Sequence, residues 1–107
     1  MRPVVPVIIQ EELQSVVDWY ENRETGLGDR FVQEYERCLG LISERPDAFG
    51  FEPYTRGDEE VRYLALRRFP YRLIYTVRGD FILLVAVAHA SRRPGYGRRR
   101  LNEIEEE

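Results

Sequence analysis

The chain has 107 residues, of which 43% are hydrophobic and 33% charged, with a formal net charge of −3 at pH 7. This length supports a single core, and we expect residues 1–107 to form one domain. No apolar run approaches the roughly 18 residues of a membrane span, and a lone cysteine excludes an internal disulfide, so we expect a cytoplasmic protein with no membrane partner.

The charge is distributed unevenly along the chain. Residues 1–60 have a net charge of −8, residues 61–100 a net charge of +9, and residues 101–107 a net charge of −4. All 16 basic residues are arginines, so every positive side chain is a planar guanidinium that suits phosphate or carboxylate. The arginine-rich stretch indicates either a polyanionic partner or a solvated surface, and both interpretations stay open.

The first half of the chain predicts a short strand and two helices. Val4–Ile9 is rich in β-branched residues, and its prolines favour a sheet edge; it is too short and too interrupted for a signal-peptide core. Apolar residues at helical spacing predict helices over Glu11–Arg23 and Gly28–Glu44, with a glycine-containing turn between them. Two such helices form a hairpin whose apolar side covers a sheet.

For two side chains of these helices, the sequence predicts whether they are buried or exposed. Cys38 lies on the apolar stripe of the second helix, which predicts a buried structural thiol rather than a reactive one. Trp19 lies off the stripe of the first helix. Packing beneath a loop is the favoured interpretation of Trp19, and a second surface or an interface is the alternative.

The second half of the chain predicts a loop over Asp47–Glu60 and then three strands. The strands are predicted over Val61–Phe69, Tyr71–Arg78 and Phe81–His89. The last strand is apolar almost throughout, as expected for a central strand covered on both faces. Pro70 has no N–H and predicts a turn or bulge before the second strand, whereas Gly79 favours a hairpin before the third.

These elements follow the order β-α-α-β-β-β. Helices in one block and strands in another predict an α+β fold, in which an antiparallel sheet has the helical hairpin packed on one face. Arg72 and Arg78 alternate with apolar residues in the second long strand. We therefore expect one face of the sheet to present arginines.

The residues that could take part in a reaction come at the end of the third long strand and directly after it. His89 stands at the strand end and is a candidate general acid or base, although a structural histidine bonded to the backbone is favoured. Arg92 and Arg93 come next, and one of them is expected near Arg72. Tyr96 offers a hydroxyl or a ring for base stacking, with a hydrophobic plug as the alternative. One histidine and one cysteine far apart give no metal site, and no cofactor is expected.

Three segments resemble a known family. They are GLGDRFVQEYERCLGLISERPDAF, RRFPYRLIYTV and ILLVAVAHASRRPGY, and the resemblance extends over about residues 7–98. They are similar to the RelE/ParE superfamily of toxins from bacterial type II toxin–antitoxin systems, and most similar to its ParE-like, plasmid-stabilisation branch. The resemblance implies a toxin that a cognate antitoxin neutralises by wrapping it with a C-terminal segment.

The superfamily divides in mechanism. The ParE-like branch implies binding to DNA gyrase on cleaved DNA, which requires a binding surface more than an active site, and this is the favoured function. The RelE-like branch implies cleavage of mRNA on the ribosome, so whether the chain is an enzyme stays open. An inactive homologue that only binds antitoxin is the third alternative.

Particular residues carry these implications. The residues that resemble the catalytic groups of RelE-like enzymes by position are His89, Arg92, Arg93 and Tyr96. Contacts to phosphate or to the target are expected from Arg67, Arg72 and Arg98. An acidic antitoxin segment is expected in a groove between the hairpin and the sheet, lined by Arg62, Arg67, Arg68 and Arg72.

Two features depart from the family pattern. Many ParE-like sequences have Tyr-Trp where this chain has Tyr96 and Gly97. Toxins of this superfamily also tend to be basic, whereas this chain is acidic overall and ends in a glutamate-rich tail at residues 103–107. We expect that tail to fold back on the arginines and weaken a nucleic-acid contact.

Overall fold

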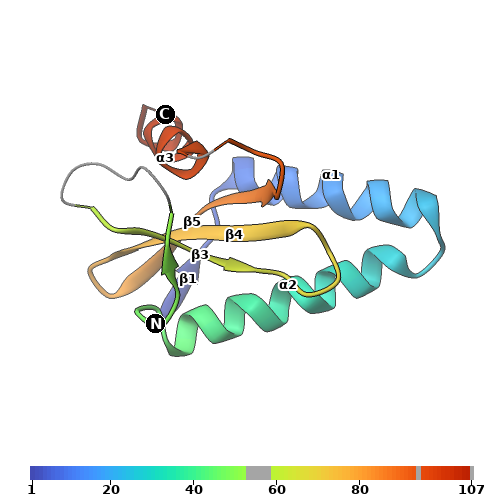
Figure 1. Cartoon of the computed structure of the whole chain (residues 1–107), viewed down its shortest axis with the longest axis horizontal. Helices are drawn as coiled ribbons and strands as arrows, with labels where there is room; N and C mark the ends of the chain where they lie inside the picture. The colour runs from blue at the N-terminus through green and yellow to red at the C-terminus, as the bar shows by residue number, and fades with distance from the viewer. Residues whose placement is uncertain (53–58, 94, 107) are drawn as a thin grey trace.

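The computed structural model describes residues 1–52, 59–93 and 95–106 (Figure 1). The helices are α1 (Val7–Arg23), α2 (Leu27–Glu44) and α3 (Tyr96–Glu106). The strands are β1 (Arg2–Val4), β2 (Gly50–Phe51), β3 (Val61–Ala65), β4 (Tyr71–Arg78) and β5 (Phe81–His89). They form one sheet in the order β1-β5-β4-β3-β2, in which β1 is parallel to β5 and the other neighbours are antiparallel.

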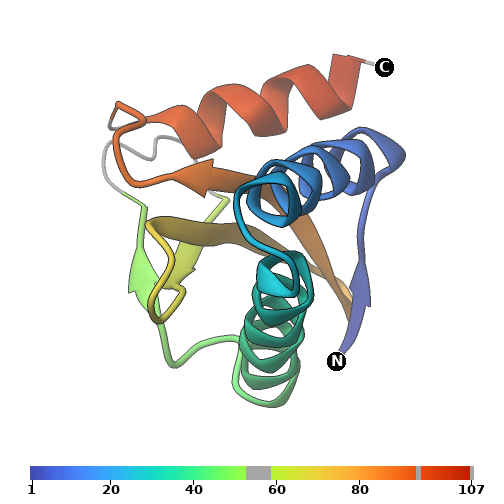
Figure 2. The same ribbon diagram turned by 90° about the vertical axis from the view of Figure 1, so that its right-hand side faces the viewer.

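The α+β fold and the helical hairpin are confirmed. The turn between the two helices contains Gly26, whose φ of 90° lies in the left-handed region that glycine adopts without strain. The hairpin packs on one face of the sheet through a core that includes Phe31, Tyr35 and Cys38 of α2. Figure 2 shows the sheet between α2 and α3, so both faces are covered over part of their area.

Strand β5 lies in the interior of the sheet, as its apolar sequence predicted. Residues 82–88 are all buried. Ile82 and Leu84 join the core beneath the hairpin, whereas Leu83 and Ala86 join a second core on the opposite face. The register with β4 shifts between Ile74 and Tyr75, which marks a β-bulge opposite residues 84–86.

The predicted first strand, Val4–Ile9, coincides with β1 only at Val4 and is otherwise wrong. Only residues 2–4 pair with β5, at the edge of the sheet as expected, and α1 begins at Val7. The Pro6 carbonyl accepts the N–H groups of Ile9 and Gln10 at 2.9 and 3.0 Å, which starts the first helical turn. Ile9 is fully buried under the hairpin. A short apolar run does not by itself distinguish a strand from a buried helical turn, so its β-branched residues misled the prediction.

The turn before β4 occurs where Pro70 predicted it, but β3 is shorter than expected. β3 ends at Ala65 rather than Phe69, and the Tyr71 N–H bonds the Phe69 carbonyl at 2.8 Å across the turn. Arg68 has a φ of 68°, a left-handed conformation that is uncommon for a residue with a side chain. The turn therefore projects from the end of the sheet beside α2.

Helix α3 covers the second face of the sheet and was not predicted. Leu101 is fully buried in the second core, together with Val61, Ile74 and Val85. Gly97 permits the close approach, because a Cβ at this position would lie 2.7 Å from Ile74 Cγ2. A larger side chain at this position would not fit between this helix and the sheet unless one of them moved.

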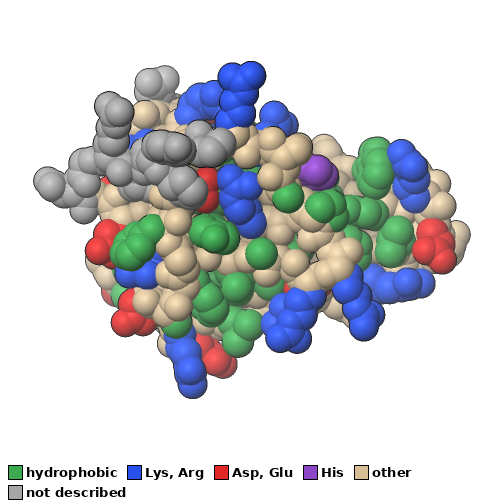
Figure 3. Space-filling view, in the orientation of Figure 1, with side chains coloured by type: hydrophobic (Ala, Val, Ile, Leu, Met, Phe, Trp, Pro, Cys, Tyr) green, Lys and Arg blue, Asp and Glu red, His purple; other side chains and the backbone are tan. Residues whose placement is uncertain are grey.

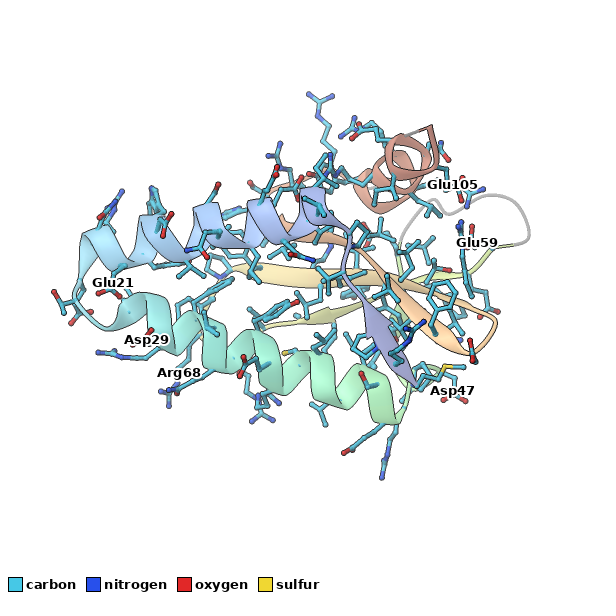
Figure 4. All side chains as sticks on the ribbon, turned by 180° about the vertical axis from the view of Figure 1, so that it is seen from behind. Glu21, Asp29, Asp47, Glu59, Arg68 and Glu105 are labelled. Carbon is cyan, nitrogen blue, oxygen red and sulfur yellow. The ribbon has the colours of Figure 1, made fainter. Side chains whose placement is uncertain are left out.

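The glutamate-rich tail folds back onto the arginines of the sheet as part of α3, as expected. Glu105 pairs with Arg78 of β4, which also pairs with Glu59 at 2.7 Å. Figure 4 shows Glu59 and Glu105 close together at this end of the molecule. The tail thus ties the end of the chain to the sheet. Within the described ranges, no helix has the length and apolar character needed to cross a membrane.

Candidate functional site

The end of β5 and the start of α3 bring four of the predicted site residues together. His89 is the last residue of β5, and its ring lies edge-on to the Tyr71 ring, with 5.2 Å between the centroids. The Ser91 N–H donates to His89 Nδ1 at 3.0 Å, and the Ser91 hydroxyl lies 2.8 Å from the same nitrogen. The imidazole is therefore held by the turn that follows its own strand.

Tyr96 begins α3, and two guanidinium groups lie close to its ring. The Arg92 guanidinium carbon is 5.1 Å from the centre of the Tyr96 ring, and that of Arg99 is 5.4 Å away. Both distances are within the range of a cation–π contact. Tyr96 also packs against the second core, so its ring supports the two guanidinium groups from below.

A surface hollow collects these cations. We call it the arginine hollow, and its lining consists of Tyr71, His89, Ser91, Arg92, Arg93 and Arg99. All three arginines are exposed. Among the described contacts, none of the three takes part in an ion pair.

The prediction that one face of the sheet presents arginines to a partner is wrong. Arg72 Nη2 lies 2.7 Å from Glu52 Oε1, and the Glu52 side chain is fully buried. Arg78 is paired with two glutamates, as described above. The acidic segment before β3 supplies Glu52 and Glu59, so the predicted cationic face is largely neutralised within the chain.

The three consecutive arginines at positions 98–100 also have different environments. Arg98 Nη1 lies 3.9 Å from Glu59 Oε2, on the side of α3 that faces the tail contacts. Arg100 is buried and pairs with Glu12 of α1 and with Glu103. Only Arg99 of this run joins the arginine hollow. Arg99 was not among the predicted site residues, and the signal that could have identified it is its i,i+3 spacing from Tyr96 on α3.

Arg67 and Arg68 lie at a different place, on the turn before β4. They line a hollow between this turn and α2, here called the α2 hollow, with Arg30, Arg37 and Phe69. Arg37 is paired with Glu34 at 2.7 Å, whereas Arg30, Arg67 and Arg68 are exposed. Figure 4 labels Arg68 beside α2, and Figure 3 shows arginines along that edge of the molecule.

Glu34 fixes the wall of the α2 hollow. Its carboxylate accepts two hydrogen bonds from Arg37, and it also accepts the Arg67 N–H. The hydrogen bonds from Arg37 contribute most to lowering the pKa of Glu34 to about 2, against the opposing effect of burial. The turn that carries Arg67 and Arg68 is thus attached to α2 by an ionised carboxylate.

Replacing Glu34 with glutamine is expected to flatten the acid limb of the stability profile. The folded-state pKa lies below the unfolded value of 4.5, so the stabilisation is present above pH 4.5 and is lost as the pH falls towards 2. We expect a loss of about 1 kcal/mol at pH 7 and none near pH 2. Urea unfolding at a series of pH values tests this, with Glu36→Gln on the exposed side of α2 as control. Equal losses at pH 7 and pH 2 would contradict it.

Arg62 belongs to neither hollow of exposed arginines. Its Nη1 donates to the Phe49 carbonyl at 2.6 Å, and its guanidinium carbon lies 4.1 Å above the Phe51 ring. It also pairs with Glu60 at 3.3 Å. The four arginines expected to line one antitoxin groove are therefore separated, with Arg67 and Arg68 on the turn and Arg62 and Arg72 on the sheet.

Trp19 does not pack beneath a loop. It is 51% exposed on α1, with the Tyr20 ring edge-on at 5.0 Å and the Arg23 guanidinium carbon 4.1 Å from its ring centre. It walls a hollow, here called the aromatic hollow, together with Tyr20, Pro70, Tyr71 and His89. The favoured interpretation of Trp19 is therefore wrong, and the alternative, a second surface or an interface, stays a prediction. Over the described residues, no group of three or more potential metal ligands occurs.

Comparison with known proteins agrees with this architecture. A family model described as "ParE toxin of type II toxin-antitoxin system, parDE" matches residues 9–94. A solved structure titled "Chromosomal ParDE TA system from P. aeruginosa" has a similar fold, with a TM-score of 0.59 and 16% identity, over 83% of this chain and 95% of that chain. No protein with a curated description is similar enough in sequence to match.

Proposed function

Because the chain belongs to the ParE toxin family of type II toxin–antitoxin systems, we propose that it binds DNA gyrase in the bacterial cytoplasm and that a cognate antitoxin neutralises it. Gyrase is the target that the ParE-like resemblance implies. A toxin that acts by binding requires an accessible surface of fixed shape, and the residues around the end of β5 provide one.

The observation that supports binding over mRNA cleavage is the bonding of the polar groups at this site. Proton transfer requires a base that reaches the substrate hydroxyl. His89 Nδ1 is instead bonded to the backbone and close to the hydroxyl of Ser91, and the Tyr96 ring lies beneath two guanidinium groups. These contacts favour a structural role for His89 and a supporting role for Tyr96.

Growth inhibition is expected to survive the loss of both candidate proton-transfer groups. Tyr96→Phe keeps the aromatic ring and removes the hydroxyl, whereas His89→Gln replaces the titratable imidazole by an uncharged amide. Induced expression in a bacterial host, with growth, transcript integrity and the DNA-damage response followed in one culture, measures the effect. We expect growth inhibition within about twofold of the unaltered chain, with intact transcripts. Cut transcripts, and their disappearance in both variants, would contradict the proposal.

We place antitoxin docking at the α2 hollow. Arg30, Arg67 and Arg68 are exposed there around Phe69, which offers guanidinium groups beside an apolar floor. An acidic segment with apolar side chains would complement both. Arg62 and Arg72 have internal partners and are proposed only as secondary contacts at the sheet.

Charge reversal in the α2 hollow is expected to weaken antitoxin binding. The variant Arg67→Glu with Arg68→Glu replaces attraction of an acidic segment by repulsion, and we expect affinity to fall at least about tenfold. Calorimetry or surface binding of the purified pair measures it. The matched control, Arg2→Glu with Arg45→Glu, changes the net charge equally at exposed positions elsewhere. Unchanged affinity in the first variant would exclude this docking site.

A further inference from the structure

The aromatic hollow and the arginine hollow adjoin on the surface of the molecule. Tyr71 and His89 line both of them. On one side lie Trp19, Tyr20 and Pro70, and on the other lie the exposed arginines of the β5–α3 turn and of α3. One continuous surface therefore changes from rings to guanidinium groups across the Tyr71 and His89 pair.

The arginine side differs from the sheet arginines, because none of its guanidinium groups forms an ion pair among the described contacts. Arg72, Arg78 and Arg100 each have a glutamate partner, as described above. Arg92 and Arg93 have none among the described contacts, and the same hollow is lined by the uncharged side chains of Tyr71 and Ser91 together with His89. Together with Arg99 they place three guanidinium groups in one hollow, which favours an anionic partner with repeated charges.

The aromatic side of this surface carries an exposed indole ring, that of Trp19. Trp19 is the only tryptophan, and half of its surface is accessible although it borders a hollow of mainly apolar lining. Rings placed next to arginines form the combination that binds unpaired nucleic-acid strands, because each base has a face for stacking and each linkage carries a negative charge. A duplex offers no free base face to such a hollow.

We propose that the aromatic hollow and the arginine hollow together bind single-stranded DNA, with a base against Trp19 and Tyr71 and phosphates on Arg92, Arg93 and Arg99. The choice of DNA over RNA rests on the proposed function, since gyrase acts on DNA.

Trp19 provides the signal for the test. The purified full chain is titrated with a single-stranded 12-nucleotide thymidine oligomer, without gyrase. Quenching of Trp19 fluorescence reports the base contact, and the anisotropy of a labelled oligomer reports binding. Trp19→Ala is expected to weaken binding about tenfold. The triple variant Arg92→Gln, Arg93→Gln, Arg99→Gln is expected to weaken it at least about tenfold and to reduce the slope of log affinity against log salt by roughly 2.

The control triple variant is Arg2→Gln, Arg30→Gln, Arg45→Gln, which has the same net charge and changes exposed positions outside both hollows. Circular dichroism verifies that every variant is folded. Absence of quenching, an equal loss in the control, or tighter binding of a uridine RNA oligomer of the same length or of a DNA duplex would each overturn the proposal. Gyrase is absent from this assay, so a negative result would exclude DNA binding by the two hollows without excluding gyrase inhibition. A negative result in the growth assay would likewise exclude gyrase inhibition without excluding DNA binding.

Discussion

Replacing Phe31 with alanine is expected to lower the free energy of unfolding by about 4 kcal/mol, because the change removes a large buried side chain and leaves a cavity. Phe31 is fully buried in the first core. Its ring lies 5.4 Å from that of Tyr20, 5.0 Å from that of Phe69 and 5.5 Å from that of Tyr71, measured between centroids. One side chain therefore connects both helices of the hairpin with the turn before β4 and with β4 itself.

Denaturant unfolding followed by circular dichroism measures this effect. Phe51→Ala is the matched control, because Phe51 is 55% exposed on the short edge strand. We expect that control to lose about 0.5 kcal/mol, as surface substitutions usually do. Similar losses for the two phenylalanines would show that the aromatic cluster is not what holds the hairpin on the sheet.

Replacing Arg72 with leucine is expected to cost about 3 kcal/mol, because it removes the cation beside a buried carboxylate. The Glu52 side chain is fully buried, and only 14% of the Arg72 side chain is exposed. Arg72 Nη1 also donates to the His89 carbonyl at 3.4 Å, so the pair connects β2 to the end of β5. Loss of the arginine thus affects both the core and the support of the arginine hollow.

The double variant Arg72→Leu with Glu52→Leu separates charge from packing. Replacing both partners of a buried ion pair by apolar residues is often nearly neutral, so we expect it to recover more than half of the lost stability. Arg30→Leu, at an exposed arginine of α2, is the control and is expected to change stability by less than about 0.5 kcal/mol. Additive losses in the double variant would contradict the explanation by loss of the Arg72 cation beside the buried carboxylate.

The strands and the hairpin could be predicted because each has a strong local pattern. The bounds of β4 and β5 match the prediction at both ends, since Pro70 and Gly79 mark their turns. The stripe of α2 was correct for the same reason, and Cys38 is buried as expected. Periodic burial is visible in sequence whenever one face of an element meets the core.

Helix α3 was missed because its sequence is mostly charged. Its apolar contribution to the second core comes chiefly from Leu101 and Ile104, and Gly97 contributes space rather than a side chain. The helix is fixed instead by ion pairs to distant residues, including Arg100 to Glu12 of α1. Contacts of this kind depend on the tertiary structure and leave no periodic trace in the sequence.

The candidate site was found only in part for a related reason. His89, Arg92, Arg93 and Tyr96 were close in sequence and could be grouped, but nothing local showed that Trp19 of α1 borders the same surface. The arginines of the sheet were predicted to be available for a partner, but they are paired with glutamates of the same chain. Their glutamate partners lie some 20 residues earlier in the chain, beyond the reach of an alternation pattern.

The buried thiol makes this chain convenient for chemical labelling. Cys38 is fully buried, and burial raises its pKa to about 11, so the reactive thiolate is scarce at neutral pH. A cysteine introduced at an exposed position, such as one beside the arginine hollow, would therefore accept a maleimide dye selectively without removal of the native one. The reaction of Cys38 itself would then proceed only through opening of the hairpin, and its rate would report how often the helices leave the sheet.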